Sequence, residues 1–403
     1  MHFPRLLSVG AAALALLLAG TRPGEASGPD AGPAFSPNAC VGGELGIESG
    51  VPVLQVGGSP QVLGQAYGRL VGEQVRYLRG RYLGRVVGGG RLKQLALRMA
   101  QPMERHIPER YLRELGALAE AAGESREDVL LLATFLDVYR LVGCSTLVAV
   151  PPAAAGEPFL ARNLDFPTLG VAHRYSMVVV YHPEGFRSFL SVTWPGLPGV
   201  VSGMNQAGLV LVMSEVSDGE QSLDGIPYQL LYRRVLEECD TVEQAEELVR
   251  RAARTMANNV VLLDGGGHAA VLEVTRHAVI RRGLQKGVLC ATNHFRGRGE
   301  GGGVWPCRRY DILSRESTRL HGRLGVGQAA ELLGMVHQGP LTMQSMIFEP
   351  GSMRVHLALG APPTTSGPYR TLDAGRLFRR RLRQMARGGQ QEEVQGDRWE
   401  GVQ

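Results

Sequence analysis

The spacing of apolar residues changes near residue 144. Before this point, apolar residues recur every three or four positions, which is typical of amphipathic helices. After it, short apolar or alternating runs predict strands, beginning with residues 146–150 and 158–162. We therefore predict a helical first third of the chain, followed by a longer region that is built on sheets.

Glycine spacing predicts a close helix contact in the first part. The dipeptide Ser59-Pro60 is a typical helix start, so a helix is predicted from residue 60 to about residue 79. Gly64, Gly68 and Gly72 fall on one face of this helix. An interior glycine costs up to about 1 kcal/mol relative to alanine, so we expect another segment to pack closely there. Further helices are predicted over residues 92–105, 108–122 and 129–141.

Beyond residue 144, groups of strands alternate with groups of helices. Turns at Pro183-Glu184-Gly185 and Asn205-Gln206-Ala207-Gly208 indicate hairpins and hence antiparallel pairing. This order predicts stacked antiparallel sheets with helical layers, a fold of the α+β class. Besides a first strand at 51–56, the further predicted strands are 176–181, 188–193, 209–214, 259–263, 269–274, 278–281, 288–291, 345–349 and 353–359. The further predicted helices are 227–238, one that starts at 241, 308–316 and 327–336.

The first residues are typical of an export signal. Residues 1–26 contain Arg5, an apolar run over residues 6–18 and the small-x-small sequence Gly24-Glu25-Ala26. Export to the periplasm or the extracellular space is therefore expected. Thr21 stands where a lipoprotein would need cysteine, and no other apolar run reaches the ~20 residues of a membrane helix. We therefore expect no membrane anchor.

Other segments of biased composition flank the predicted fold. Residues 27–50 are rich in glycine, proline, alanine and serine, which predicts a linker. Basic residues concentrate in 376–387, where a terminal helix with a solvated basic face is favoured over contact with an anionic surface. Residues 388–403 are predicted to be disordered. The net charge of the 403 residues is only +5 and no nucleic-acid-binding motif occurs, so no nucleic-acid partner is predicted.

Five cysteines follow the predicted export signal: Cys40, Cys144, Cys239, Cys290 and Cys307. In an oxidising compartment, four of them could form two disulfides and leave Cys144 free, or all five could be reduced and mostly buried. No HExxH, paired CxxC or EF-hand spacing is present, and the glycine-rich stretches lack the strand-to-helix setting of a phosphate loop. No metal and no cofactor are therefore predicted.

Cys144 is the candidate nucleophile, because it follows Gly143 at the junction of a predicted helix and a predicted strand. A cut between Gly143 and Cys144 would free an α-amine with a pKa near ~8, well matched to a thiol pKa near ~8.5. Cys144 would then supply both the nucleophile and its base. The alternative is an inert buried thiol, since free cysteine is among the most buried residue types.

Two charged residues follow on the next predicted strand. Arg162 and Asp165 could fold back against Cys144, and buried opposite charges are expected to pair. In the functional interpretation, Asp165 holds the α-amine or the thiol of Cys144, and Arg162 sets the local charge. The alternative is a purely structural ion pair.

Asn293 follows a strand of buried character in the sequence Thr292-Asn293-His294-Phe295. Its amide could donate to a developing oxyanion, a contact worth ~3 kcal/mol, or it could simply cap a turn. His294 allows a different mechanism, a Cys-His peptidase that would be active in the uncut chain. The amine-base mechanism is favoured, because a cut before Cys144 needs no imidazole.

With these residues, the chain resembles the choloylglycine hydrolase and acid ceramidase superfamily of N-terminal nucleophile hydrolases, above all its penicillin acyltransferase-like branch. The resemblance covers roughly residues 51–372 and depends on several motifs in family order. These are Gly57-Gly58-Ser59-Pro60 leading to Gly64 and Gly68, Gly143-Cys144-Ser145-Thr146, Arg162-Asn163-Leu164-Asp165, Gly203-Met204-Asn205-Gln206-Ala207-Gly208-Leu209, Thr292-Asn293-His294-Phe295 and Arg309-Tyr310.

The resemblance implies a four-layer αββα sandwich and self-cleavage between Gly143 and Cys144. Residues 51–143 would form a helical N-terminal segment that stays as a non-covalent partner of a catalytic segment, residues 144–387. The resemblance carries over five site residues: Cys144 as nucleophile, Arg162 and Asp165 as its polar neighbours, Asn293 as oxyanion donor and Arg309 as a structural or catalytic arginine. The chain departs from the family at Ser214-Glu215, where bile-salt and penicillin V hydrolases have an oxyanion asparagine.

The function expected from these features is that of an exported, self-processed cysteine amidohydrolase or acyltransferase. It would act on a small non-peptide N-acyl amide through a thioester on Cys144, with hydrolysis more frequent than transfer. Two alternatives remain open: a binding scaffold of the same fold without turnover, and the Cys-His peptidase that uses His294. The sequence leaves the oligomeric state open.

Overall fold

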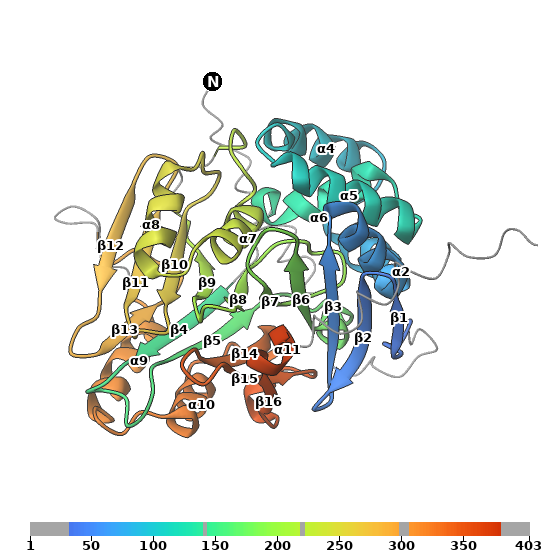
Figure 1. Ribbon diagram of the computed structural model, residues 1–403. Helices are drawn as coiled ribbons and strands as arrows, with labels where there is room; N and C mark the ends of the chain where they lie inside the picture. Colours follow the sequence, from blue (N-terminus) through green and yellow to red (C-terminus); the bar gives the residue numbers. More distant parts are fainter. Residues whose placement is uncertain (1–31, 140–142, 218–221, 298–305, 380–403) are drawn as a thin grey trace, which may run out of the picture.

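The computed structural model describes residues 32–139, 143–217, 222–297 and 306–379. The predicted export signal, residues 140–142 before the predicted cut and the predicted disordered tail lie outside these ranges. Within the described residues, two β-sheets lie face to face and helices cover their outer sides (Figure 1).

One sheet has ten strands and the other has six. In spatial order, the larger sheet consists of β1 (Asn38–Cys40), β2 (Gly43–Glu48), β3 (Val51–Gly58), β6 (Met177–Pro183), β7 (Phe189–Thr193), β8 (Ser202–Asn205), β9 (Val210–Glu215), β10 (Asn258–Leu263), β11 (Ala269–Val274) and β12 (Val279–Gly283). The smaller sheet consists of β13 (Val288–Ala291), β4 (Gly143–Ala149), β5 (Phe159–Asp165), β14 (Thr342–Glu349), β15 (Arg354–Leu359) and β16 (Arg370–Asp373).

The helices fall into three groups along the chain. Before β4 come α2 (Pro60–Leu78), the π-helical turn η1 (Arg79–Leu83), α3 (Gly84–Val87), α4 (Arg91–Glu104), α5 (Glu109–Ala122) and α6 (Arg126–Val138). Between β9 and β10 come α7 (Tyr228–Glu238) and α8 (Val242–Arg251). The last group is α9 (Arg308–Arg319), α10 (Val326–Met335) and α11 (Ala374–Arg379). Short 3-10 turns are η2 (Ala172–Tyr175), η3 (Gly339–Leu341) and η4 (Thr364–Ser366).

Alternating side chains of the strands build three apolar layers. Val178 and Val212 of the larger sheet share one buried cluster with Leu160 and Phe348 of the smaller sheet, so these faces pack against each other. The other face of the larger sheet packs on α2 and on α5 to α8, and the outer face of the smaller sheet packs on α9 and α10. The predicted four-layer αββα fold is therefore confirmed.

The predicted glycine face of α2 is also confirmed. Ser59 caps the helix, and the glycines lie against α5. A Cβ atom added to Gly64 would lie 2.2 Å from the carbonyl oxygen of Glu114, and one added to Gly68 would lie 2.8 Å from that of Leu118. Because both are main-chain atoms, neither contact could be relieved by a side-chain rotation, and the two backbones can approach only at glycine.

The prediction of a linker over residues 27–50 is wrong for its second half. Residues 38–48 form β1 and β2, which extend the larger sheet. Gly42 and Gly50 have positive φ angles of 82° and 78°, which allow the tight turns on either side of β2. The glycines thus mark hairpin turns between short strands, not a structureless connection.

The larger sheet also contains a parallel pair, against the expectation of antiparallel pairing throughout. β3 and β6 run parallel, with Val53 opposite Val178. Parallel neighbours need a long crossover connection. Here that connection contains α2 to α6 together with β4 and β5. The helical first segment therefore lies, in the order of the chain, between two neighbouring strands of the larger sheet.

Several smaller differences concern element ends and cysteine pairing. The predicted strands did not include β8 or β16, and α6 ends at Val138 instead of residue 141. All five cysteines are free thiols, so the two possible disulfides are not formed. Of the predicted basic helix 376–387, only the part up to Arg379 lies within the described residues, in α11. No helix among the described residues is both long and apolar enough to cross a membrane.

Candidate active site

Cys144 is the second residue of β4, on the face of the smaller sheet that meets the larger sheet. Its Cα lies opposite Leu164 of β5, and its side chain is fully buried. The thiol Sγ is 3.4 Å from the carbonyl oxygen of Met213, on β9 of the larger sheet. The candidate nucleophile is therefore held between the two sheets.

Arg162 brings a positive charge to this thiol. Its Nη2 lies 2.9 Å from Cys144 Sγ and donates to the carbonyl oxygen of Met213 at 2.6 Å, while Nη1 contacts Val201 O and Ser202 Oγ. The guanidinium is completely buried, and no described carboxylate lies within ion-pair distance of it. Burial raises the pKa of Cys144, and Arg162 acts in the opposite direction. A thiolate on Cys144 would supply the counter-ion that Arg162 otherwise lacks.

Asp165 does not pair with Arg162, which corrects the sequence-based expectation. Residues three apart on a strand face opposite sides, so Asp165 lies on the outer side of the smaller sheet. It accepts hydrogen bonds from Thr342 and from Gln338 Nε2 and lies 3.7 Å from Arg309 Nη1. A Cβ atom on Gly143 would lie 2.6 Å from Gln338 Nε2 and 3.1 Å from Asp165 Cβ. Asp165 therefore lies beside the predicted cleavage junction and does not contact the thiol.

Asn293 and Arg309 hold the main chain of Cys144. The Oδ1 atom of Asn293 accepts from the Cys144 nitrogen at 3.0 Å and from Arg309 Nη2 at 2.9 Å. Arg309 Nη1 donates to the Cys144 carbonyl oxygen and, at 3.1 Å, to Ser145 Oγ. The nitrogen that would become the α-amine is thus fixed by a side chain that lies 149 positions further along the chain.

The predicted oxyanion donor, the Nδ2 atom of Asn293, already donates to a main-chain carbonyl. The acceptor is the carbonyl oxygen of Glu215, at 2.9 Å, within the Ser214-Glu215 pair that departs from the resemblance to bile-salt and penicillin V hydrolases. The Glu215 carboxylate accepts from Tyr228 at 3.0 Å, and Ser214 lies buried beside the thiol. The sequence marked Ser214-Glu215 only as a departure from the family and did not predict that Ser214 lies beside the thiol.

His294 is not placed for a Cys-His dyad. The hydrogen-bond partners of the Cys144 thiol among the described residues are Arg162 and Met213, not an imidazole. Partial burial lowers the pKa of His294, and the positive charges of Arg296 and Arg309 lower it further. The geometry therefore does not support the peptidase alternative. Among the described residues, no group of three or more His, Cys, Asp or Glu side chains could hold a metal ion.

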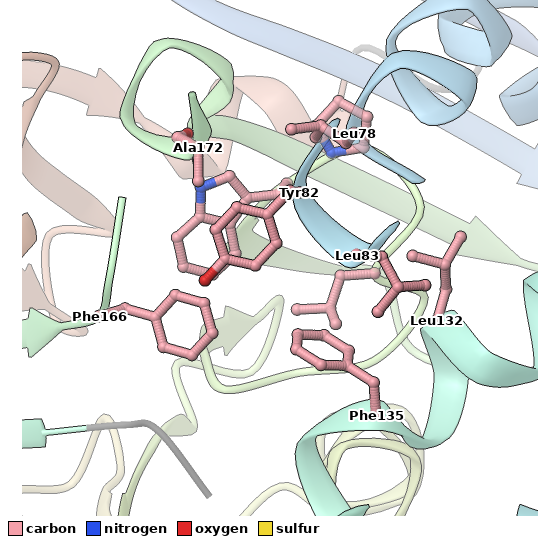
Figure 2. Close-up of a pocket in the computed structure, with 10 residues that line it drawn as sticks. Leu78, Tyr82, Leu83, Leu132, Phe135, Phe166 and Ala172 are labelled. Carbon is pink, nitrogen blue, oxygen red and sulfur yellow. Dashed lines mark hydrogen bonds between the residues drawn. The ribbon is translucent and has the colours of Figure 1, made fainter. Parts of the chain in front are cut away.

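An apolar pocket lies in the same hydrophobic cluster as Cys144. It encloses about 50 Å³, and Figure 2 shows Tyr82, Phe135 and Phe166 around it. Phe166 stacks with Tyr82 at a centroid distance of 5.8 Å. It follows β5 directly and, by alternation, lies on the same face as Arg162 and Leu164. The lining residues are Leu78, Tyr82, Leu83, Leu132, Phe135, Phe166, Ala172, Trp194, Pro195 and Leu197. Half of them belong to the helical segment before the predicted cut.

A buried acid near the end of α6 predicts a pH-dependent stability. Burial raises the pKa of Asp137 to about 7, although Thr255 and the Tyr228 amide donate to its carboxylate. The unfolded value is near ~4, so the folded chain binds this proton more tightly between these values. Its contribution is complete below pH 4 and is lost as the pH rises through 7. Thermal unfolding from pH 4 to 8 should show this loss in the wild type but not in Asp137→Asn.

The exposed Asp311 offers a control, because Asp311→Asn should keep the pH profile of the wild type. If Asp137→Asn loses as much stability between pH 4 and 8 as the wild type does, Asp137 is not the titrating group.

One family of known proteins matches much of this chain. It is described as acyl-coenzyme A:6-aminopenicillanic acid acyl-transferase, and the match covers residues 153–356, just over half of the 403 residues. The matched region contains Arg162, Asp165, Asn293 and Arg309 but begins after Cys144. It therefore includes Arg162, which contacts the thiol, and Asn293 and Arg309, which hold the main chain of Cys144.

Two curated relatives share part of the sequence. An uncharacterised protein of Archaeoglobus fulgidus is 26% identical over 266 residues, which make up 57% of this chain and 44% of that protein. Protein dcd1A of Dictyostelium discoideum is 23% identical over 163 residues, or 38% of this chain and 37% of that protein. The chain thus matches less than half of the length of either relative.

Three solved structures have similar parts. An N-acylethanolamine-hydrolyzing acid amidase ortholog from Caenorhabditis elegans has a TM-score of 0.42 at 19% identity, covering 57% of this chain and 99% of its own. A mutant conjugated bile acid hydrolase from Clostridium perfringens has a TM-score of 0.42 at 13% identity, and the match covers 58% of this chain and 93% of that protein. Penicillin V acylase from Agrobacterium tumefaciens has a TM-score of 0.38 at 16% identity, and the match covers 54% of this chain and 83% of that protein.

Proposed function

This chain belongs to the acyl-coenzyme A:6-aminopenicillanic acid acyl-transferase family of N-terminal nucleophile hydrolases, and we propose that it is a self-processed cysteine amidase. It cleaves a small non-peptide N-acyl amide through a thioester on Cys144. The observation that carries this proposal is the set of contacts around one residue. Arg162 lies on the thiol of Cys144, Asn293 on its nitrogen and Arg309 on its carbonyl oxygen.

In the proposed processing step, Cys144 Sγ attacks the carbonyl carbon of Gly143. The bond from this carbon to the Cys144 nitrogen breaks, the nitrogen takes up a proton and a thioester forms in its place. Water then hydrolyses the thioester, which releases the carboxylate of Gly143 and restores the thiol. Asn293 Oδ1, which accepts from the Cys144 nitrogen in the uncut chain, remains in position to hold the new amine.

In the proposed turnover, this α-amine takes the proton from the thiol, and the thiolate attacks the acyl carbon of the substrate. Arg162 stabilises the thiolate because it is a buried cation without a described carboxylate partner. The substrate C–N bond breaks as the amine half takes the proton from the Cys144 ammonium. Water hydrolyses the acyl-thioester to the free acid, or a second amine accepts the acyl group. We expect hydrolysis to be the main outcome, because water is in large excess.

The apolar pocket supports an apolar acyl group in the substrate. Tyr82 and Phe135 come from the helical segment, whereas Phe166 and Trp194 come from the catalytic segment. Its lining includes a π-helical turn, a feature that often occurs at functional sites. Aromatic and aliphatic walls bind an acyl chain or an aryl group by burial of apolar surface. Loss of the helical segment would therefore remove half of the acyl site.

Buried charges support the proposal that this N-terminal segment stays bound after the cut. Arg233 of α7 donates to both carboxylate oxygens of Glu114 of α5, at 2.7 and 2.6 Å, and to Glu237 at 2.8 Å. Tyr111 of α5 donates to Glu237 at 2.6 Å. Separation of the fragments would take Glu114 away from Arg233 and Tyr111 away from Glu237, which is unfavourable for buried charged groups.

We also propose that the protein is exported, for which the support is the signal-like sequence of residues 1–26.

The proposed activity can be tested with protein whose cut at Cys144 has been verified by mass spectrometry. It should be incubated with N-acyl amino acids, N-acyl homoserine lactones and penicillins, with and without added amines, and the free acid and any new amide quantified. We expect free acid from substrates with an apolar acyl group, and some new amide when a suitable amine is added. Correctly cut protein that releases neither product would support the binding scaffold instead.

A further inference from the structure

Gln338 closes the outer side of the residue before the predicted cut. It follows α10, and its side chain lies against Gly143, because a Cβ atom added to this glycine would come within 2.6 Å of the Gln338 Nε2 atom. The thiol of Cys144 lies on the opposite, inner face of the same strand. The peptide bond between the two residues is therefore enclosed by the thiol on one side and by the amide on the other.

Asp165 holds this amide in place. Gln338 Nε2 donates to the Asp165 Oδ2 atom at 2.6 Å, and because a carboxylate only accepts, the nitrogen of the amide must face it. The carboxylate is almost fully buried. Its other oxygen accepts from Thr342, whose hydroxyl in turn accepts from the Gln338 main-chain amide at 2.7 Å. Turning the Gln338 side chain away would take a donor from a buried charged group, which is more costly than the loss of an ordinary hydrogen bond.

The main chain on both sides of Gln338 is fixed to β5 and to the residue that follows this strand. Before Gln338, the Leu333 carbonyl oxygen accepts from Asn163 Nδ2 at 2.8 Å. After it, the Leu341 carbonyl oxygen accepts from the Phe166 amide at 2.7 Å. The segment is therefore not free to withdraw as a whole, and only a rotation of the Gln338 side chain could make room for a larger residue before the cut.

A side chain on residue 143 would disturb the bond that is cut. Ordinary contacts between non-bonded atoms are about 3.5 Å long, so an added Cβ atom requires a movement of about 1 Å. If the amide stays on Asp165, the main chain of Gly143 has to move. Cys144 cannot follow, because Asn293 and Arg309 hold its main chain. A misplacement of about 1 Å between reacting atoms can lower a rate about 100-fold.

We propose that Gln338 is a positioning residue of self-processing. It fixes the main chain of Gly143 within reach of the Cys144 thiol, and because of it the position before the cut accepts glycine alone. This inference rests on the proposed self-processing and adds a residue to it. Gln338 makes and breaks no bond. Its amide determines where the Gly143 carbonyl carbon lies when Sγ attacks it.

The test is a double-mutant cycle on the rate of self-processing, measured by intact-mass spectrometry of full-length chain made by cell-free synthesis. Gly143→Ala should slow the cut about 100-fold, because the methyl group displaces the main chain. Gln338→Ala should slow it about 10-fold, the scale of one lost hydrogen bond to a charged group. With both substitutions the rate should equal that of Gln338→Ala alone, whereas independent effects would multiply to about 1000-fold.

The matched control is Gly334→Ala, which adds the same Cβ atom on α10, where no described neighbour lies within 4 Å. This variant should be cut at the normal rate. Gly143→Ala that is cut as fast as the wild type, or a double variant that is slower than Gln338→Ala, would overturn the inference while self-processing stands. A wild type that stays uncut would refute self-processing itself, and the inference with it.

Melting temperatures of the same substitutions in Cys144→Ala, which lacks the attacking sulfur, separate positioning from folding. All variants should be folded at the temperature of the processing assay. If the rates fall only in variants that are partly unfolded at that temperature, Gln338 has a structural role alone and the inference fails.

Discussion

Replacing Cys144 with alanine is expected to leave the chain in one piece and without measurable turnover. The wild type should separate on a denaturing gel into a fragment that ends at Gly143 and a larger fragment that begins with Cys144. Both processing and turnover need the same sulfur, because Sγ attacks first the Gly143 carbonyl carbon and later the acyl carbon of the substrate. Alanine is smaller than cysteine and fits the buried site of Cys144, so the fold should be retained.

The control for this experiment is Cys290→Ala, since Cys290 is a second buried thiol in the same sheet. Its Cα lies opposite Leu147 of β4, and burial raises the pKa of Cys290 to about 12. Such a thiol is inert at neutral pH. Cys290→Ala should therefore be cut and active, with only a loss of packing. An active wild type that remains uncut would refute the amine-base mechanism.

Replacing Asn293 with alanine is expected to lower turnover by about two to three orders of magnitude, the range for loss of one oxyanion-hole donor. In the uncut chain its Oδ1 anchors the Cys144 nitrogen and its Nδ2 donates to Glu215. After the cut, the Nδ2 donor can turn to the substrate oxyanion only if it leaves the Glu215 carbonyl. Processing should slow as well, because Asn293→Ala also removes the anchor of the nitrogen. Both rates can be measured by mass spectrometry of intact protein and of product.

Asn293→Asp separates the two roles of this side chain. Aspartate keeps an acceptor for the Cys144 nitrogen and for Arg309 but has no Nδ2 donor. If donation to the oxyanion matters, Asn293→Asp should process at nearly the normal rate and still lose turnover as severely as Asn293→Ala. Turnover of Asn293→Asp within a few-fold of the wild type would show that Asn293 acts as an anchor alone. A large loss of melting temperature with normal activity per folded molecule would indicate a structural role.

Local sequence signals were sufficient for most helices, hairpins and the candidate nucleophile. Ser59-Pro60 predicted the start of α2, and the glycine spacing on that helix predicted its close contact with α5. The turn at Asn205 and the strand after it were also predictable, because turn residues and alternating apolar residues act over a few positions. Cys144 was singled out by its neighbour Gly143 and by the change of period at this point.

Element ends and linkers were less predictable, because glycine-rich stretches serve several purposes. Residues 38–48 have the composition of a linker but form two strands, since Gly42 and Gly50 take positive φ angles at their turns. The parallel pairing of β3 with β6 could not be read from hairpin signals. It depends on a crossover of more than a hundred residues, whose path is decided by packing on both sheets.

The sequence by itself determined which residue carries the thiol, where the chain turns from helices to strands and which polar residues were candidates. Only the tertiary structure decided what these residues contact. It placed Arg162 on the thiol and Asp165 on the opposite face of β5, and it brought Asn293 and Arg309 to the main chain of Cys144. The physical reason is that these contacts span up to 165 positions and depend on strand register, which the packing of both sheets selects.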